Sequence, residues 1–449
     1  MPRKAITRLP QPLFNEPVFN EGVATPDPTQ FRQSHPSDTQ QYKQIQNLLK
    51  KDVVGFQASR AKPGDLFALE SALGPHGPEV VQDIQKSGRI VFHAAGDTGA
   101  SNVRKYGNEV RVFDQLTADC HTADPASRPQ FLFHLGDVVY DFGESQYYYD
   151  QFYEPLRNYP GPVFVIPGNH DSFVIPNTPA AKTPLTTFVR NFCSPNPVVT
   201  PEAASLHRTA MTQPGVYFTL DAPFVRIIGL FSNALEDPGL ISSEGGKWPG
   251  VPDVQLAYLT AQLQRIKKEN YAGAVLLATH HPPFSYAPPP ASGGAGGNHS
   301  SSSTMLREID TICKAQGVYP HAFLSGHAHN YQRYTRTVNF GGKAFDVPFI
   351  ICGNGGHNAN PLVQARKGQP AQEPATGISV SYLDGKPAVS AGGLLLEKYD
   401  DRNYGYLRIT VDSRQMAIGF FQVGATGSLA QSGADMVTVD LASHTMVSN

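Results

Sequence analysis

Side chains that can bind metal ions follow five short apolar runs in the sequence. Each run ends in glycine or another small residue, and the polar side chains come within the next few positions. Hard oxygen donors mixed with imidazoles suit iron, manganese or zinc better than copper or a thiolate site. The residues concerned are Asp97, Asp137, Tyr140, Asn169, His170, Asp171, His280, His281, His327 and His329.

The apolar runs have the length of strands and contain almost no polar residues, as expected for strands buried on both faces of a sheet. Helical stretches alternate with them, and the clearest is 253–270, where leucine and isoleucine recur at helical spacing. This alternation predicts a layered α/β domain. The five runs are RIVFHAAG from Arg89, QFLFHLG from Gln130, PVFVIPG from Pro162, AVLLATH from Ala274 and HAFLSG from His321.

Parallel strands would bring the metal-binding side chains together, because the carboxyl ends of such strands lie along one edge of a sheet. We expect the small residue before each ligand, usually glycine, to let the backbone turn sharply there. A carboxylate able to touch two ions predicts a dinuclear centre with ions about 3.5–4 Å apart. Such a pair clamps a phosphoryl group and lowers the pKa of a bridging water, so that hydroxide forms near neutral pH.

The composition excludes several other classes of protein. The 449 residues include 36 Lys plus Arg and 38 Asp plus Glu, a net charge of -2 that would not attract nucleic acid over a broad face. No apolar run approaches the ~18 residues of a membrane span, so no membrane insertion is expected. The four cysteines are widely spaced and form no CxxC pair, which indicates buried free thiols. The oligomeric state is left open.

The motifs GDTG, GDVVY, GNHD, HHPP and GHAH, in this order, resemble those of the calcineurin-like metallophosphoesterases. GDTG together with GDVVY is similar to the purple acid phosphatase branch, in which a tyrosine phenolate binds Fe(III). Other branches usually have histidine where this chain has Gly99. The resemblance covers about residues 89–334 and implies a four-layer α/β/β/α sandwich. Three further runs near the C-terminus have the pattern of antiparallel strands.

The resemblance also implies a role for each motif residue. A ferric ion and a divalent ion (Fe, Zn or Mn) would share the Asp137 carboxylate. His170 would contact the substrate and either donate a proton to the leaving oxygen or stabilise the phosphoryl charge. The ferric ligands would be Asp97, Asp137, Tyr140 and His329, and the divalent ion would be completed by Asn169, His280 and His327.

The roles of His281 and Asp171, which lie next to motif residues in the sequence, each have two alternatives. In the family the ligand stands two residues before a proline, so Pro282 selects His280 as the ligand and leaves His281 behind the metals or facing the substrate. Asp171 could orient His170 through a ring nitrogen, as carboxylates beside active-site histidines often do. It could equally cap the following segment. We therefore expect His170, Asp171 and His281 to serve catalysis.

These residues predict a metal-dependent hydrolase that attacks phosphate monoesters with a metal-bound hydroxide, as an acid phosphatase does. The alternative enzyme is a phosphodiesterase acting on nucleotide or phospholipid-type diesters. A third reading is a non-catalytic scaffold with the same fold, but such scaffolds have lost metal ligands and here every ligand position is filled. The expected partner is a small phosphate ester.

Outside the motifs we expect three regions: an N-terminal extension over 1–88, a catalytic domain over 89–425 and a C-terminal tail over 426–449. The low-complexity loop 288–303 is a candidate lid. His299 and His357 could reach a substrate phosphate, and the GNGG segment before His357 lacks the Lys and Ser/Thr of a P-loop. The first residues contain no apolar signal core, which predicts a cytoplasmic protein, or a periplasmic or secreted one if a signal has been removed.

Overall fold

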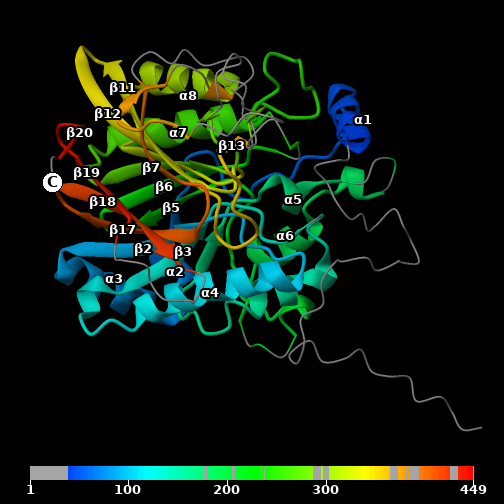
Figure 1. Ribbon diagram of the computed structural model, residues 1–449, viewed down its shortest axis with the longest axis horizontal. Coiled ribbons are helices and arrows are strands. Elements are labelled where there is room, and N and C mark those ends of the chain that lie inside the picture. The colour runs from blue at the N-terminus through cyan, green and yellow to red at the C-terminus, as the bar shows by residue number, and fades with distance from the viewer. Residues whose placement is uncertain are drawn as a thin grey trace, which may run out of the picture.

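Two large sheets packed face to face, with helices on their outer sides, make up the computed structural model of the protein (Figure 1). Two two-stranded pairs, β9 (Ala295–Gly296) with β13 (Val363–Gln364) and β8 (Ser285–Tyr286) with β15 (Leu383–Asp384), lie beside them. The structure describes residues 39–140, 142–174, 177, 179–204, 206, 208–233, 235–236, 238–286, 295–296, 303–364, 373–380, 383–384, 394–424 and 433–447.

The larger sheet has nine strands, and its centre is parallel. Strands β6, β7 and β10 run parallel to one another, and β11 and β16 extend the sheet antiparallel. In spatial order the strands are β1 (Phe67–Ala68), β5 (Phe218–Ala222), β6 (Val225–Leu230), β7 (Ala274–Thr279), β10 (Ala322–Ser325), β12 (Lys343–Cys352), β11 (Tyr331–Phe340), β16 (Leu394–Asp400) and β14 (Ile378–Ser379).

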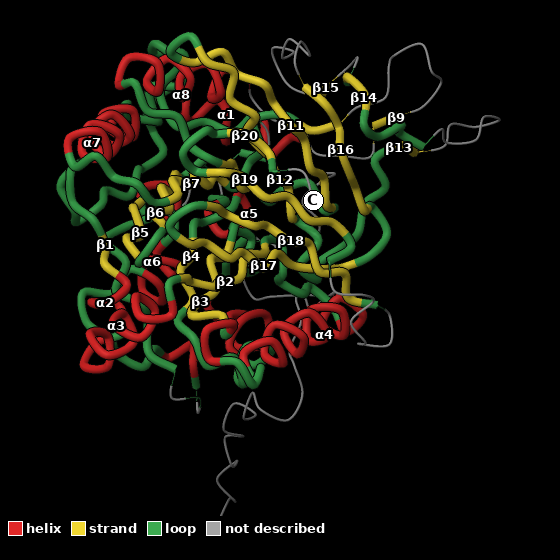
Figure 2. The backbone as a smooth tube through the Cα atoms, turned by 90° about the vertical axis from the view of Figure 1, so that its left-hand side faces the viewer, coloured by secondary structure: helices red, strands yellow, loops and turns green. Residues whose placement is uncertain are grey.

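The smaller sheet has seven strands and joins β2, β3 and β4 to the C-terminal strands. Strands β2, β3 and β4 are parallel, whereas β17 pairs antiparallel with β2 and continues into the C-terminal strands (Figure 2). In spatial order the strands are β20 (Thr445–Met446), β19 (Asp435–Asp440), β18 (Gln415–Val423), β17 (Tyr404–Asp412), β2 (Arg89–Ala95), β3 (Pro129–His134) and β4 (Val163–Val165).

The longest helices cover the outer face of each sheet. Helices α7 and α8 lie outside the nine-stranded sheet and α4 lies outside the seven-stranded sheet (Figure 1), whereas Ile84 of α3 packs into the core between the sheets. The helices are α1 (Thr39–Lys50), α2 (Leu69–Ala72), α3 (Gly77–Ser87), α4 (Val103–Cys120), α5 (Asn169–Ser172), α6 (Thr186–Phe192), α7 (Val254–Lys268) and α8 (Ser303–Gln316). Of these, α7 is the helix expected over 253–270.

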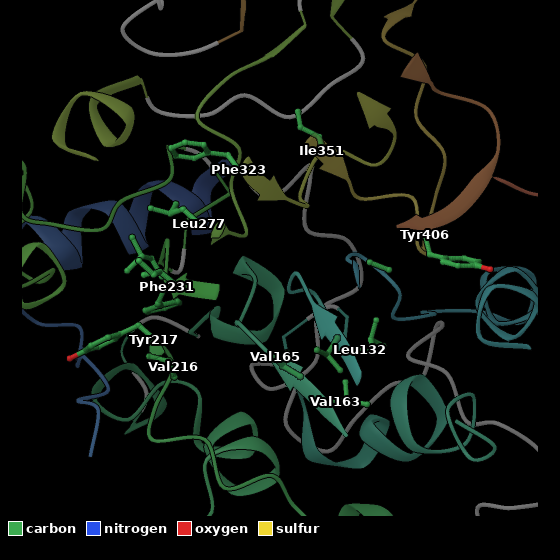
Figure 3. Close-up of a cluster of buried hydrophobic side chains, with 14 of the residues drawn as sticks. Leu132, Val163, Val165, Val216, Tyr217, Phe231, Leu277, Phe323, Ile351 and Tyr406 are labelled. Atoms are coloured by element: carbon green, nitrogen blue, oxygen red, sulfur yellow. The ribbon is translucent and has the colours of Figure 1, made fainter. Parts of the chain in front are cut away.

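Successive residues of the central strands enter two different cores. In β7, Leu276 lies in the core between the sheets, whereas Leu277 lies in the core under the helices, where Phe323 of β10 also packs (Figure 3). In β3, Phe131 and Phe133 point between the sheets and Leu132 points outward. This arrangement explains the unbroken apolar runs, because both faces of each strand are buried.

The layered α/β architecture and the antiparallel C-terminal strands are confirmed. The four cysteines are buried and free, as expected. Within the described part of the chain, none of the helices is long and apolar enough to cross a bilayer. The loop proposed as a lid lies outside the described residues, apart from 295–296 and 303, and so does His299.

The predicted domain boundaries remain predictions, but the elements near them can be placed. The described part of the 1–88 extension includes α1–α3 and β1, and β1 pairs with β5 at the edge of the nine-stranded sheet. The predicted tail from 426 includes β19 and β20 of the seven-stranded sheet. These segments complete the sheets because β1 and β19 hydrogen-bond directly to their neighbours.

Candidate metal centre

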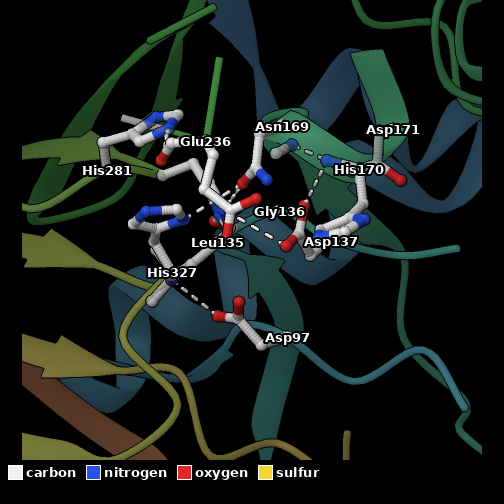
Figure 4. A network of polar contacts seen from close by, with 12 residues as sticks. Asp97, Leu135, Gly136, Asp137, Asn169, His170, Asp171, Glu236, His281 and His327 are labelled. Carbon is white, nitrogen blue, oxygen red and sulfur yellow. Dashed lines mark hydrogen bonds and ion pairs between the residues drawn. The ribbon is translucent and has the colours of Figure 1, made fainter. Parts of the chain in front are cut away.

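Predicted ligands from both sheets lie together where the carboxyl ends of the strands meet, as Figure 4 shows for Asp97, Asp137, Asn169 and His327. Asp97 and Asp137 follow β2 and β3, and Asn169 begins α5 after β4, all in the seven-stranded sheet. His280 and His327 follow β7 and β10 in the nine-stranded sheet. The ligand set is therefore divided between the two sheets.

One group of donor atoms surrounds the Tyr140 phenol oxygen. This oxygen lies 3.0 Å from Asp137 Oδ2, 3.2 Å from His329 Nε2 and 3.3 Å from Asp97 Oδ1. The donor atoms of Asp97, Asp137 and His329 all lie within 4.8 Å of one another and are buried. A phenol that faces two buried carboxylates can donate its one proton to only one of them, so a cation fits this cluster better than hydrogen bonds alone.

A second group surrounds the Asn169 side-chain oxygen. This Oδ1 lies 2.9 Å from His280 Nε2 and 3.0 Å from His327 Nδ1. His280 Nδ1 is 2.8 Å from the Leu135 carbonyl, to which its N–H donates, so Nε2 is the nitrogen left to bind a metal ion in place of its proton. Asp137 Oδ2 is 3.4 Å from His280 Nε2 and thus belongs to both groups. The two donor sets fit two cations that share Asp137.

The backbone at the ligands differs from our expectation. The left-handed conformation is adopted by the ligands themselves, with φ of 57° at Asp97 and Asp137 and 67° at His327, as well as by Gly136. The glycines are needed mainly for space. A Cβ on Gly168 would lie 2.7 Å from Asp137 Cγ, and one on Gly326 would lie 2.5 Å from Asp97 Oδ2. Glycine lets neighbouring loops press against the carboxylates.

Charges within the centre stabilise the anionic carboxylate. Burial opposes ionisation of Asp137, but His280 and His170 hold its pKa well below the usual range. Burial lowers and Asp137 raises the pKa of His280, with a net value of about 9. Burial and the carboxylates of Asp137 and Asp97 raise the pKa of Tyr140 well above normal, so the phenol requires a cation to ionise near neutral pH.

His170 lies directly beside the first donor group. Its backbone N–H donates to Asp137 Oδ1 at 2.9 Å, and its ring packs against Tyr140 with centroids 4.2 Å apart. A bond from the Asp171 carboxylate to a ring nitrogen of His170 was one of the two alternatives, but the hydrogen-bond partners of Asp171 are backbone groups. Its carboxylate accepts hydrogen bonds from the backbone N–H groups of Val138, Val139 and Gly168 at 2.9–3.2 Å.

Asp171 therefore ties the loop after β3 to the start of α5, which is close to the capping alternative. Burial and the nearby Asp137 raise the pKa of Asp171 to about 7, while the three backbone donors act in the opposite direction. The hydrogen bonds of this carboxylate position the Asp137 loop rather than an imidazole.

His281 lies beside the ligands with both ring nitrogens engaged by protein. Nδ1 is 2.7 Å from Ser232 Oγ, and Nε2 is 2.7 Å from the Leu235 carbonyl and 3.1 Å from the Glu236 carbonyl. Its ring packs against His327 with centroids 4.3 Å apart. Of the two open alternatives, the structure places His281 behind a ligand. Figure 4 also shows the Glu236 side chain extending toward the ligands, which the sequence did not indicate.

Two further residues reach the centre from distant segments. His357 stacks on Tyr140 with ring centroids 3.5 Å apart and an interplanar angle of 18°. Lys105, in the first turn of α4, lies with its Nζ 2.7 Å from His357 Nε2. Burial, followed by Lys105, lowers the pKa of His357 well below its usual value. Glycines before His357 were the only sequence signal, and Lys105 had none.

Comparisons with known proteins agree with this arrangement at the level of the family. Residues 90–331, more than half of the chain, match the family model described as calcineurin-like phosphoesterase. No curated protein matches the chain.

Two solved structures share a general similarity with the chain. GAP50, the anchor in the inner membrane complex of Plasmodium, gives a TM-score of 0.45 at 10% identity over 76% of this chain and 87% of that chain. The structure of PhoD gives a TM-score of 0.45 at 14% identity over 80% of this chain and 72% of that chain.

Proposed function

The chain belongs to the calcineurin-like phosphoesterase family, and we propose that it hydrolyses phosphate monoesters at a dinuclear centre like that of the purple acid phosphatases. Family membership makes it a metal-dependent phosphoester hydrolase with a divalent metal centre. The observation that carries the finer proposal is the position of the Tyr140 phenol oxygen, 3.0–3.3 Å from donor atoms of Asp97, Asp137 and His329. A phenol within a carboxylate and imidazole cluster is a ligand set suited to Fe(III).

We assign the two groups of donors to two ions. Asp97, Asp137, Tyr140 and His329 would hold Fe(III), while Asp137, Asn169, His280 and His327 would hold Fe, Zn or Mn in the divalent state. When bound, such ions polarise a phosphoryl group and lower the pKa of water. The shared Asp137 Oδ2 supports this assignment, because it faces the Tyr140 oxygen at 3.0 Å and His280 Nε2 at 3.4 Å.

Protein groups beside the ligands supply hydrogen bonds to the substrate. Asn169 Nδ2 is buried and has no hydrogen-bond partner within the described residues, so it can donate to a phosphoryl oxygen. We assign His170 to the leaving oxygen or the phosphoryl charge, because its backbone and ring both contact residues of the centre. Hydrogen-bond donors fixed in a buried site stabilise the charge that develops during phosphoryl transfer.

The test compares a chromogenic phosphate monoester with the matching diester over a range of pH, using protein whose metals have been quantified. A monoester preference at acidic pH is the expected result. A preference for the diester would contradict the monoesterase proposal and support the alternative, a phosphodiesterase. No turnover of either, with two metal ions bound, would contradict the acid phosphatase assignment.

Two variants test the assignment of the ligands. Asp137→Asn should abolish turnover and reduce the binding of both ions while the circular dichroism spectrum stays that of the wild type. Tyr140→Phe should lose the visible charge-transfer band of the iron-loaded protein. A wild-type protein that holds stoichiometric Fe(III) and is colourless would refute the tyrosine ligand.

A further inference from the structure

The Tyr140 ring is held between two imidazoles that come from different segments. His357 stacks on it with ring centroids 3.5 Å apart, at an angle of 18°, and His170 packs against it at 4.2 Å and 37°. The ring is fully buried. The phenol oxygen therefore has little freedom to leave the carboxylates that it faces, and His357 makes the closer and more nearly parallel contact.

Hydrogen bonds on three sides determine the orientation of His357. Its backbone N–H donates to the carbonyl of Asp97 at 3.0 Å. Its Nδ1–H donates to the carbonyl of Gly99 at 2.6 Å, which leaves Nε2 as the acceptor for the Lys105 ammonium at 2.7 Å. This tautomer is set by the protein, since a carbonyl can only accept and an ammonium can only donate.

The glycines before His357 allow this approach. A Cβ on Gly355 would lie 2.8 Å from the Thr98 side chain, and one on Gly356 would lie 2.7 Å from the Glu109 backbone. Gly356 also has a φ of 149°, a conformation that side chains rarely adopt. The GNGG segment thus passes between the Asp97 loop and α4. Its sequence serves to bring His357 over Tyr140 rather than to bind nucleotide phosphates.

We propose that His357, held by Lys105, is a positioning residue that fixes the Tyr140 phenol and strengthens it as a metal ligand. The inference rests on the proposed function, in which Tyr140 binds the metal ion. An ammonium that donates to Nε2 withdraws electron density from the imidazole ring. An electron-poor ring stacked on an electron-rich phenolate is favourable. The pair therefore stabilises the ligand in the state that a ferric ion requires.

A role in packing alone makes a different prediction. Packing needs only a flat ring at position 357, so phenylalanine would serve as well as histidine and the charge of Lys105 would not matter. The proposed role needs the ring, its two hydrogen bonds and the ammonium. The variants His357→Phe and Lys105→Met separate the two roles, because both keep most of the apolar volume.

The first experiment uses the full-length, iron-loaded protein. In Lys105→Met and His357→Phe we expect the charge-transfer band to move to longer wavelength, because the phenolate is less stabilised. Iron binding should weaken by about 10- to 100-fold, as is typical when a residue that contacts and orients a metal ligand is mutated. Lys86→Met is the control, since Lys86 is an exposed residue of α3 that bonds only locally, to Gln82 and Asp83. Wild-type spectra and affinities in both test variants would overturn the proposal.

The second experiment needs no metal and separates this inference from the proposed function. In metal-free protein with labelled tyrosine, the Tyr140 signals are identified by their loss in Tyr140→Phe. Nuclear magnetic resonance should show slow ring flipping in the wild type and faster flipping in His357→Ala. Flipping that is unchanged in His357→Ala would refute the positioning role. A wild-type protein that binds iron without a band would refute the ferric–tyrosinate centre alone, and metal affinity and ring flipping would still decide on His357.

Discussion

Replacing Gly168 by alanine should displace the carboxylate that both donor groups share. The added Cβ would lie 2.7 Å from Asp137 Cγ and closer still to Oδ1. Carbon atoms pack at about 3.5–4.0 Å, so the carboxyl group must move by about 1 Å. That shift breaks its 2.9 Å hydrogen bond from the His170 backbone. Gly168 itself has a φ of -89°, which alanine adopts readily, so the effect is steric.

The expected magnitude follows from two contributions. Overpacking a dense interior costs about 1–3 kcal/mol. Losing a hydrogen bond to a charged acceptor costs about 1.5–3 kcal/mol. Together they predict a decrease of about 2.5–6 kcal/mol in the free energy of unfolding. Because Asp137 Oδ2 faces both donor groups, binding of both metal ions should weaken as well.

Urea unfolding of the metal-free protein and titration with metal ions measure the two effects separately. Gly107→Ala is the matched control, because Gly107 lies within α4 and a Cβ there meets nothing within 4 Å. Alanine in a helix should stabilise that variant by up to about 1 kcal/mol. The reasoning fails if Gly168→Ala unfolds within about 0.5 kcal/mol of wild type and still binds two ions tightly.

Two further predictions concern buried polar groups. Asp171→Asn leaves a backbone N–H of the Asp137 loop or of Gly168 facing an amide NH₂. Urea unfolding should therefore show a decrease of about 1–3 kcal/mol in the free energy of unfolding. Unchanged stability with a large loss of kcat would instead favour a role in orienting His170. Burial lowers the pKa of His321 to about 4 and that of His444 to about 3, against an ordinary 6.5. The unfolded chain therefore binds more protons below pH 6.5, and stability should fall by about 3 kcal/mol for His321 between pH 6.5 and 4. His444→Asn, compatible with the φ of 59° there, should make urea unfolding less sensitive to pH, and an unchanged pH dependence would contradict this account.

The sequence predicted the strands, and the side chains that follow them, well because each apolar run carries its own signal. Leu276 and Leu277 are both buried, on opposite faces of β7, and this requirement is visible as an unbroken run. Asp97, Asp137 and His327 are at fixed distances after their strands, so parallel topology alone brings them together. Local pattern and topology were sufficient for these elements.

Other features depend on contacts between distant segments, which spacing does not show. Lys105 and His357 are 252 positions apart and meet only because the GNGG segment passes beside α4. The partners of Asp171 are backbone N–H groups, and these carry no residue-specific signal. The short edge strand β1 has only two residues, Phe67 and Ala68, and is fixed by its pairing with β5 rather than by its own composition.

The division of the proposed ligands between the two sheets would make bound metal ions cross-links between the halves of the sandwich. Asp97, Asp137 and Asn169 belong to one sheet, and His280, His327 and His329 approach from the other. High affinity therefore requires that the sheets have already docked, so metal uptake reports the completion of folding. A bound ion in turn opposes separation of the sheets, by an amount that grows with the logarithm of free metal concentration. Metal supply would then determine how long each molecule survives, as well as whether it is active.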